Sequence, residues 1–192
     1  MHLTYLEGHY HWRLTKLMIP GILPLLYLYE NHYSTYPNEL WMIFPKDLRN
    51  LNDILEQYPS SIDFKQALKI LIHTAETLNA YHHYDLAHGN LKSSYILIDD
   101  NKDTSFLADW GPILSNDISI IEDCHRATEQ RVNKDIQDFG HIGLQITEAI
   151  KEKTNSIRDF KQLMKKCTDI SYHSRMSAHD LCSALNSIYN SI

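Results

Sequence analysis

Hydrophobic residues fall into short runs near the start of the chain and into helical spacing further on. Residues 19–29 and 39–45 are rich in leucine, isoleucine and aromatic side chains, and the polar stretch ENHYSTYPN separates them. Short apolar runs bounded by polar residues are typical of strands. We therefore expect two strands joined by a loop here.

The next segments combine two helices with a hairpin. Residues 48–57 place their leucines and isoleucine on one helical face, and residues 62–84 continue this pattern over a longer span. We expect Ser60 or Ser61 to cap the longer helix. Residues 95–108 contain two apolar runs, YILID and TSFLA, around the polar turn DNKD, which predicts a hairpin.

Three further helices are expected toward the end of the chain. Residues 134–150 are apolar nearly all round, which is typical of a helix in the centre of a domain. Residues 156–167 have one apolar face, and residues 177–192 open with a capping box of Ser177 and Asp180. The pattern as a whole predicts an α+β domain dominated by helix.

Length and composition narrow the classes of function. The 192 residues suit one domain, and the net charge of -6 argues against a nucleic-acid partner. Three widely spaced cysteines favour neither a disulfide framework nor a cysteine zinc site, and they suggest a reducing compartment. The twelve histidines lack ligand spacing, so no metal is expected. The apolar stretch 17–29 is too short to span a membrane and contains two prolines.

The six glycines bear on nucleotide binding. None of them falls into the clustered spacing with which backbone N–H groups surround a phosphate. We therefore expect no nucleotide cofactor.

Several segments occur in an order that resembles the protein kinases. HGNLKSSYILID is similar to the catalytic loop and the strand after it, and ADWG is similar to the metal-binding D-F-G. RATEQRV, KDIQDFG and CTDISYHSRMSAHDL are similar to the A-P-E element, the start of helix F and the C-terminal D-P-x-x-R-P-S. The group resembled is the tyrosine-kinase-like one. The spacing is similar to that of integrin-linked kinase and of the mixed-lineage-kinase-domain-like pseudokinases.

This resemblance implies a protein-kinase-like fold that consists mostly of the helical C-lobe. Residues 1–192 would form a single pseudokinase domain, with 1–45 as an N-lobe remnant and hinge and 46–192 as the C-lobe. The eighteen residues before the first apolar run leave room for a remnant of helix C, and not for the Gly-rich loop or the strand-3 lysine.

The same resemblance places substitutions at the catalytic positions. Asn90 stands where the family has its catalytic Asp, and a neutral amide cannot accept the proton of a substrate hydroxyl. Tyr95 stands at the metal-binding Asn and is a poor Mg²⁺ ligand. Gly89 stands at the Arg of H-R-D. We therefore expect a pseudokinase without catalytic residues, cofactor or metal.

Other positions match the family. Lys92 corresponds to the catalytic-loop lysine, and Asp109, Trp110 and Gly111 form a vestigial D-F-G. His88 and Trp110 would pack in the internal spine.

Three positions would have structural roles. Asp135 would hold the catalytic-loop backbone by hydrogen bonds, and Glu129 and Arg175 would form a buried ion pair.

The expected function is a cytoplasmic binding module that docks onto a signalling kinase or a kinase-associated protein, as a decoy or regulator. One version is a pathogen-encoded inhibitor of host cell-death or innate signalling that acts through a receptor-interacting kinase. The alternatives are residual phosphoryl or nucleotidyl transfer by Asp109 and Lys92, and a constitutive scaffold subunit. The tyrosines of residues 27–36 could form a contact surface or be ordinary exposed loop aromatics.

Overall fold

The structure is a computed structural model that describes residues 3–31, 39–58, 61–100, 104–108, 128–150, 154–169 and 176–192. Helices and small antiparallel sheets alternate along it, so the predicted α+β class is confirmed. In chain order the elements are α1 (Leu3–Lys16), β1 (Tyr27–Asn31), β2 (Glu39–Ile43), β3 (Arg49–Asn50), α2 (Leu51–Gln57), α3 (Phe64–His83), the 3-10 turn η2 (Ser93–Tyr95), β4 (Ile96–Asp99), β5 (Thr104–Leu107), α5 (Glu129–Ala149), α6 (Asn155–Thr168) and α7 (Ala178–Tyr189).

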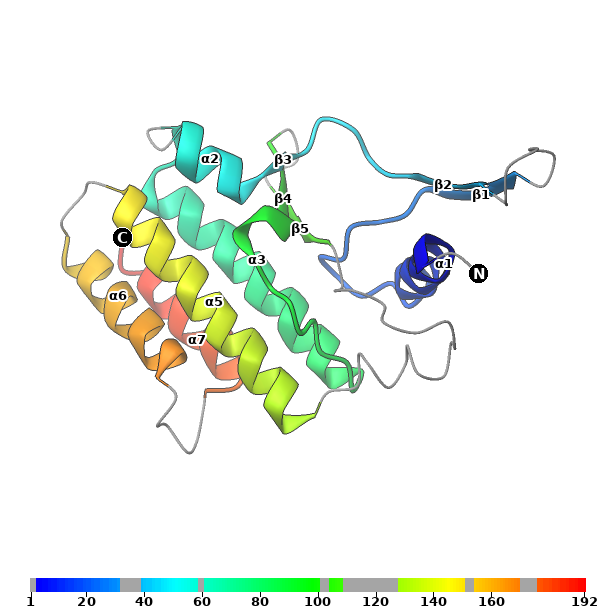
Figure 1. Cartoon of the computed structure of the whole chain (residues 1–192). Helices are drawn as coiled ribbons and strands as arrows, with labels where there is room; N and C mark the ends of the chain where they lie inside the picture. Colours follow the sequence, from blue (N-terminus) through cyan, green and yellow to red (C-terminus); the bar gives the residue numbers. More distant parts are fainter. Residues whose placement is uncertain are drawn as a thin grey trace.

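Helices α3, α5, α6 and α7 lie side by side and form the larger part of the molecule (Figure 1). Helix α6 packs on α5, and α7 packs on α3. The rings of Phe64 on α3 and Phe160 on α6 meet edge to face, with their centroids 5.5 Å apart. Each helix contributes its apolar stripe to one continuous core.

Helix α3 begins with a different capping residue from the one predicted. Helix α3 is capped by Asp63, not by Ser60 or Ser61, because the Asp63 carboxylate accepts a hydrogen bond from the Gln66 N–H and the Gln66 side chain accepts one from the Asp63 N–H. The Ser61 hydroxyl instead donates to the carbonyl of Tyr58 at 2.7 Å. Ser60 lies outside the described residues.

Two other helices begin at different residues from those predicted. Helix α2 begins at Leu51, because Arg49 and Asn50 pair with β4 as strand β3. Helix α5 begins at Glu129, where the Thr128 hydroxyl caps it. Helix α5 is also one-sided and not apolar all round: His141, Gln145 and Glu148 are exposed.

The strands form two separate sheets. Strands β1 and β2 pair antiparallel, with Tyr27 opposite Ile43 and Tyr29 opposite Trp41. Strands β3, β4 and β5 form an antiparallel sheet that contacts α3, which confirms the hairpin predicted for residues 95–108. The strand predicted over residues 19–29 begins only at Tyr27 as β1. The residues before it form no strand and make a single parallel bridge, between Ile22 and Leu107.

That irregular segment connects the N-terminal part to the helical part. The Leu107 N–H donates to the Gly21 carbonyl at 2.7 Å, and the Leu23 N–H donates to the Leu107 carbonyl at 3.0 Å. Gly21 has a φ of +79°, and a Cβ at this position would overlap the Thr77 hydroxyl on α3. Only glycine therefore fits at this contact.

Helix α1 covers most of the residues before the first apolar run, and its assignment as a remnant of helix C stays a prediction. It contacts β1 and β2, and the hydroxyl of Tyr10 lies 3.0 Å from the hydroxyl of Tyr81 on α3. None of the helices in the described part of the chain has the length and apolar character needed to cross a membrane.

Candidate functional site

The centre of the candidate site is Asp135, a fully buried carboxylate on α5. One of its oxygens, Oδ2, accepts a hydrogen bond from the backbone N–H of His88 at 2.8 Å. The other, Oδ1, accepts one from the N–H of Gly89 at 2.7 Å. These are the hydrogen bonds predicted for Asp135. They fix the loop that follows α3 against the start of α5.

The side chain of His82, on the last turn of α3, completes this arrangement. Its Nε2 lies 2.9 Å from Asp135 Oδ2. Because a carboxylate only accepts hydrogen bonds, Nε2 carries the hydrogen. Asp135 thus joins two donors of the loop and one of α3, and burial of its charge is tolerable because each oxygen is hydrogen-bonded.

His88 is buried and connects the loop to β5. Its Nε2 lies 3.0 Å from the carbonyl of Ala108, so Nε2 donates, and its Nδ1 accepts a hydrogen bond from the Asn90 N–H at 3.3 Å. The ring is therefore neutral, with its hydrogen on Nε2. A neutral, doubly bonded imidazole in this position holds the loop in shape.

The residues that the resemblance places at degenerate catalytic positions belong to this anchored loop or follow it directly. Asn90 is half-buried and Lys92 is exposed. The Lys92 ammonium lies 5.5 Å from the centroid of the Tyr95 ring, and that ring stacks on His88 with centroids 6.3 Å apart. The predicted site residues from His88 to Tyr95 therefore come together. The side chain of Asn90 is an amide, which is a poor proton acceptor.

Other predicted site residues are not placed. Asp109, Trp110, Gly111 and Arg175 lie outside the described residues. Glu129 is exposed in the first turn of α5, and its ion pair with Arg175 stays a prediction. Within the described ranges, no three His, Cys, Asp or Glu side chains gather as a metal site would need.

The described cysteines have suppressed reactivity. Burial raises the pKa of Cys167 to about 11, and burial followed by the nearby Glu76 charge raises the pKa of Cys182 to about 11. The thiolate is the nucleophilic form, so both side chains are almost entirely in the unreactive thiol form near neutral pH.

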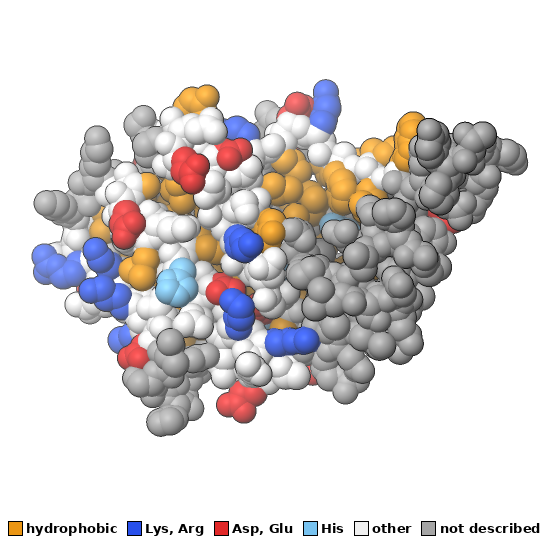
Figure 2. Space-filling model, in the orientation of Figure 1, with side chains coloured by type: hydrophobic (Ala, Val, Ile, Leu, Met, Phe, Trp, Pro, Cys, Tyr) orange, Lys and Arg blue, Asp and Glu red, His pale blue; other side chains and the backbone are white. Residues whose placement is uncertain are grey.

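One face of the β1–β2 hairpin is apolar and open to solvent. Tyr27, Tyr29, Trp41 and Ile43 are exposed by 68%, 54%, 58% and 46%, and their cross-strand pairing puts them on the same face. We name these four residues the hairpin face. Hydrophobic side chains also gather in the viewed surface where the hairpin joins the helical part (Figure 2). The tyrosine-rich segment thus supplies an exposed surface through Tyr27 and Tyr29.

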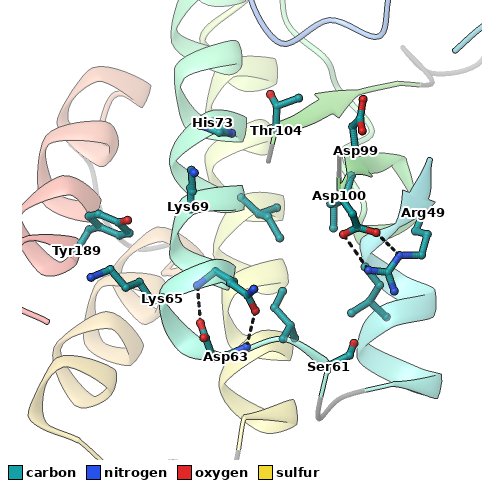
Figure 3. Close-up of a pocket in the computed structure, with 15 residues that line it drawn as sticks. Arg49, Ser61, Asp63, Lys65, Lys69, His73, Asp99, Asp100, Thr104 and Tyr189 are labelled. Atoms are coloured by element: carbon teal, nitrogen blue, oxygen red, sulfur yellow. Dashed lines mark hydrogen bonds and ion pairs between the residues drawn. The ribbon is translucent and has the colours of Figure 1, made fainter. Parts of the chain in front are cut away.

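A second feature is a pocket of about 520 Å³ over α3 (Figure 3). Lys65, Lys69 and His73, one helical turn apart from each other, line it from α3, and Asp99 and Asp100 line it from the end of β4. This pocket was not predicted from the sequence. The recurrence of basic residues every four positions in 65–73 is the signal that could have indicated it.

Comparisons with known proteins assign no family to the chain. No family matches its sequence, and no curated protein matches it either.

Proposed function

We propose that the chain is a protein-kinase-like binding module without phosphoryl-transfer activity, which docks onto a signalling kinase or a kinase-associated protein. The proposed likeness to kinases rests on the order of the sequence motifs. The proposed lack of phosphoryl-transfer activity rests on Asn90 and Tyr95.

The observation that carries the proposal is the contrast around Asp135. Its hydrogen bonds to His88 and Gly89 keep the loop in a fixed shape, while the side chain that follows them, Asn90, cannot act as a base. Phosphoryl transfer depends on positioning and on charge. A loop that is held in place without its base suits recognition better than catalysis.

The hairpin face supports a binding role independently. Exposed apolar patches on a soluble domain commonly mark contact sites for other proteins, and Tyr and Trp are enriched in such contacts. Two of its residues, Tyr29 and Trp41, already pack edge to face with their ring centroids 6.4 Å apart. This pre-arranged pair lowers the entropy cost of docking.

A thermal-shift assay with ATP and Mg²⁺ or Mn²⁺ tests the proposed lack of phosphoryl-transfer activity. Binding of a ligand at 100 times its Kd stabilises a fold by about 2.7 kcal/mol, which a melting curve resolves easily. We expect no shift at millimolar nucleotide. A clear shift together with label transfer from γ-labelled ATP, lost in Lys92→Ala, would instead support the alternative of residual transfer by Asp109 and Lys92.

Affinity capture with quantitative mass spectrometry tests the binding part. The expected result is enrichment of a protein kinase or of a protein associated with one. A receptor-interacting kinase is the specific partner that the resemblance to mixed-lineage-kinase-domain-like pseudokinases suggests. A stable, stoichiometric complex on size exclusion that never releases its partner would favour the scaffold-subunit alternative.

A further inference from the structure

We infer that the pocket over α3 is a binding site for a small amphipathic organic anion, with one phosphate or carboxylate attached to a flat or aliphatic body. This inference does not depend on the proposed function, because the pocket shares no residue with the loop around Asp135 or with the hairpin face. The pocket volume of about 520 Å³ falls in the range of small-molecule sites, roughly 300–1,000 Å³.

Lys65, at one end of a row of basic side chains, gives the site its preference for anions. Lys65, Lys69 and His73 follow each other at intervals of one helical turn, so the row extends about 12 Å along α3. The ammonium of Lys65 lies 5.1 Å from the centroid of the Tyr189 ring on α7, and it has no carboxylate partner in the described part of the chain. The ring holds the ammonium in place and leaves its charge uncompensated.

The acidic residues of the pocket already have partners. Asp63 accepts the Gln66 N–H as the cap of α3, and Asp100 accepts two hydrogen bonds from Arg49 at 2.7 and 2.9 Å. Figure 3 shows Arg49 and Asp100 pointing at each other on the side of the pocket away from Tyr189. The charges of Arg49 and Asp100 cancel each other, and Asp99 also has an interaction partner, which leaves Lys65 as a cation of the pocket that a ligand anion can reach.

The wall between these two sides is apolar. It is formed by four isoleucines from α2, the α2–α3 connection, α3 and β4: Ile54, Ile62, Ile70 and Ile98. All of these except Ile70 are buried. A ligand body placed here would lose water from apolar surface at about 25 cal/mol per Å². The pocket therefore favours an anion that carries a hydrophobic group over a bare inorganic ion.

His73 supplies a second sign that a ligand belongs here. Its Nδ1 is buried and has no hydrogen-bond partner among the described residues. Buried polar atoms in folded proteins are nearly always hydrogen-bonded, and an exception needs an explanation. His73 lies beside Thr104 at the far end of the row from Lys65 (Figure 3). Because Nδ1 is closed to solvent as the ring stands, a turn of the ring would bring it to a polar group on the ligand body.

The test is an NMR titration of the ¹⁵N-labelled full chain with phenyl phosphate, inorganic phosphate and benzyl alcohol. Phenyl phosphate should shift the amide signals of Lys65, Lys69 and His73, and should bind at least fivefold more tightly than either fragment alone. Shifts confined to other residues, or inorganic phosphate binding as tightly as phenyl phosphate, would overturn the inference.

Two double variants distinguish binding at this pocket from a general attraction of anions to positive charge anywhere on the chain. Lys65→Gln with Lys69→Gln should weaken phenyl phosphate binding at least fivefold. The matched control is Lys161→Gln with Lys165→Gln, which removes the same charge at the same spacing from exposed positions on α6. The control should stay within twofold of the unmodified chain. Equal weakening of phenyl phosphate binding in both pairs would contradict a site on α3. If the Lys65 and Lys69 variant does not fold, the amide shifts mapped on the unmodified chain show whether the ligand binds at α3.

Discussion

Helix α3 and the β1–β2 hairpin place their apolar side chains differently. Helix α3 alone buries a continuous stripe from Phe64 to Tyr81. The β1–β2 hairpin instead turns Tyr27, Tyr29, Trp41 and Ile43 toward solvent. Since burial of apolar surface is the main source of stability, the helical part holds the fold and the hairpin face is available to a partner.

Two carboxylates, Asp135 and Glu30, differ in the same way. In the helical part, Asp135 is fully buried and each of its oxygens is hydrogen-bonded. In the N-terminal part, Glu30 meets His9 at 2.8 Å in a partly exposed pair. Four changes test how far this contrast extends, beginning with the largest expected effect.

Asp135→Ala should destabilise the fold most. It leaves the N–H groups of His88 and Gly89 and the ring of His82 without their acceptor, and each unsatisfied donor costs about 1–3 kcal/mol. We expect a loss of about 3 kcal/mol or more in the free energy of unfolding, measured by urea denaturation. Asp138→Ala is the control on the same helix. It removes an i,i+4 pair with Lys134, worth about 0.5 kcal/mol. Equal losses in the two variants would contradict the anchoring role of Asp135.

Gly21→Ala should destabilise the junction between the two parts. The added Cβ meets Thr77, and the residue must also keep a positive φ, which together should cost about 2–3 kcal/mol. Gly89→Ala is the matched comparison, because Gly89 has a φ of +75° and no atom within 4 Å of an added Cβ. It should cost about 1 kcal/mol. Differential scanning calorimetry of both variants checks this order, and the reverse order would show that Gly21 does not pack against α3.

A smaller effect is expected from pH at His11 on α1. Its Nε2 donates to the Leu23 carbonyl at 2.6 Å, and burial lowers the pKa of the ring below its ordinary value of 6.5, despite that hydrogen bond. The unfolded chain therefore binds the proton more readily, so the contribution of His11 to stability is full above pH 6.5 and is lost as pH falls through its folded pKa.

Comparison with His11→Gln isolates this contribution, because the Gln amide can donate to the same carbonyl and does not titrate. The stability of the unmodified chain relative to this variant should fall when the pH drops from 7.5 to 5.5 in urea denaturation. A difference that stays constant, or grows in favour of the unmodified chain at low pH, would show that His11 is accessible to protons in the fold.

The smallest effect on stability is expected at the hairpin face. Trp41→Ala removes an exposed ring that meets Tyr29 across the strands, so the loss in the free energy of unfolding should stay below about 1 kcal/mol. Its effect on partner binding should be much larger, because aromatic side chains at the centre of an interface carry much of the binding energy. A melting temperature that falls as far as in Asp135→Ala would mean that this face is structural.

The sequence predicted the helices well where apolar spacing was regular. The buried side chains of α6 and the capping box of Ser177 and Asp180 occur as expected, because local patterns determine them. The N-cap of α3 was wrong because Asp63 and Gln66 satisfy each other and leave Ser61 to bond elsewhere. The start of α5 was missed because its first turns contain few apolar residues.

The candidate site was predicted through the family resemblance and the pocket was not predicted at all. The contact of Asp135 with His88 joins positions 47 residues apart, which no local pattern could show. The pocket likewise needs α3 and the end of β4 to lie together, and that follows from packing of the β3–β5 sheet on α3. Viewed on α3 alone, the basic row looks like a solvated helix face.

The most direct test of the account is affinity capture with three forms of the chain: unmodified, Tyr29→Ala with Trp41→Ala, and the pocket pair Lys65→Gln with Lys69→Gln. The account predicts that a protein kinase or kinase-associated protein is enriched by the unmodified chain and by the pocket pair, and is lost with the hairpin-face pair. Enrichment of no such protein by the unmodified chain would contradict it.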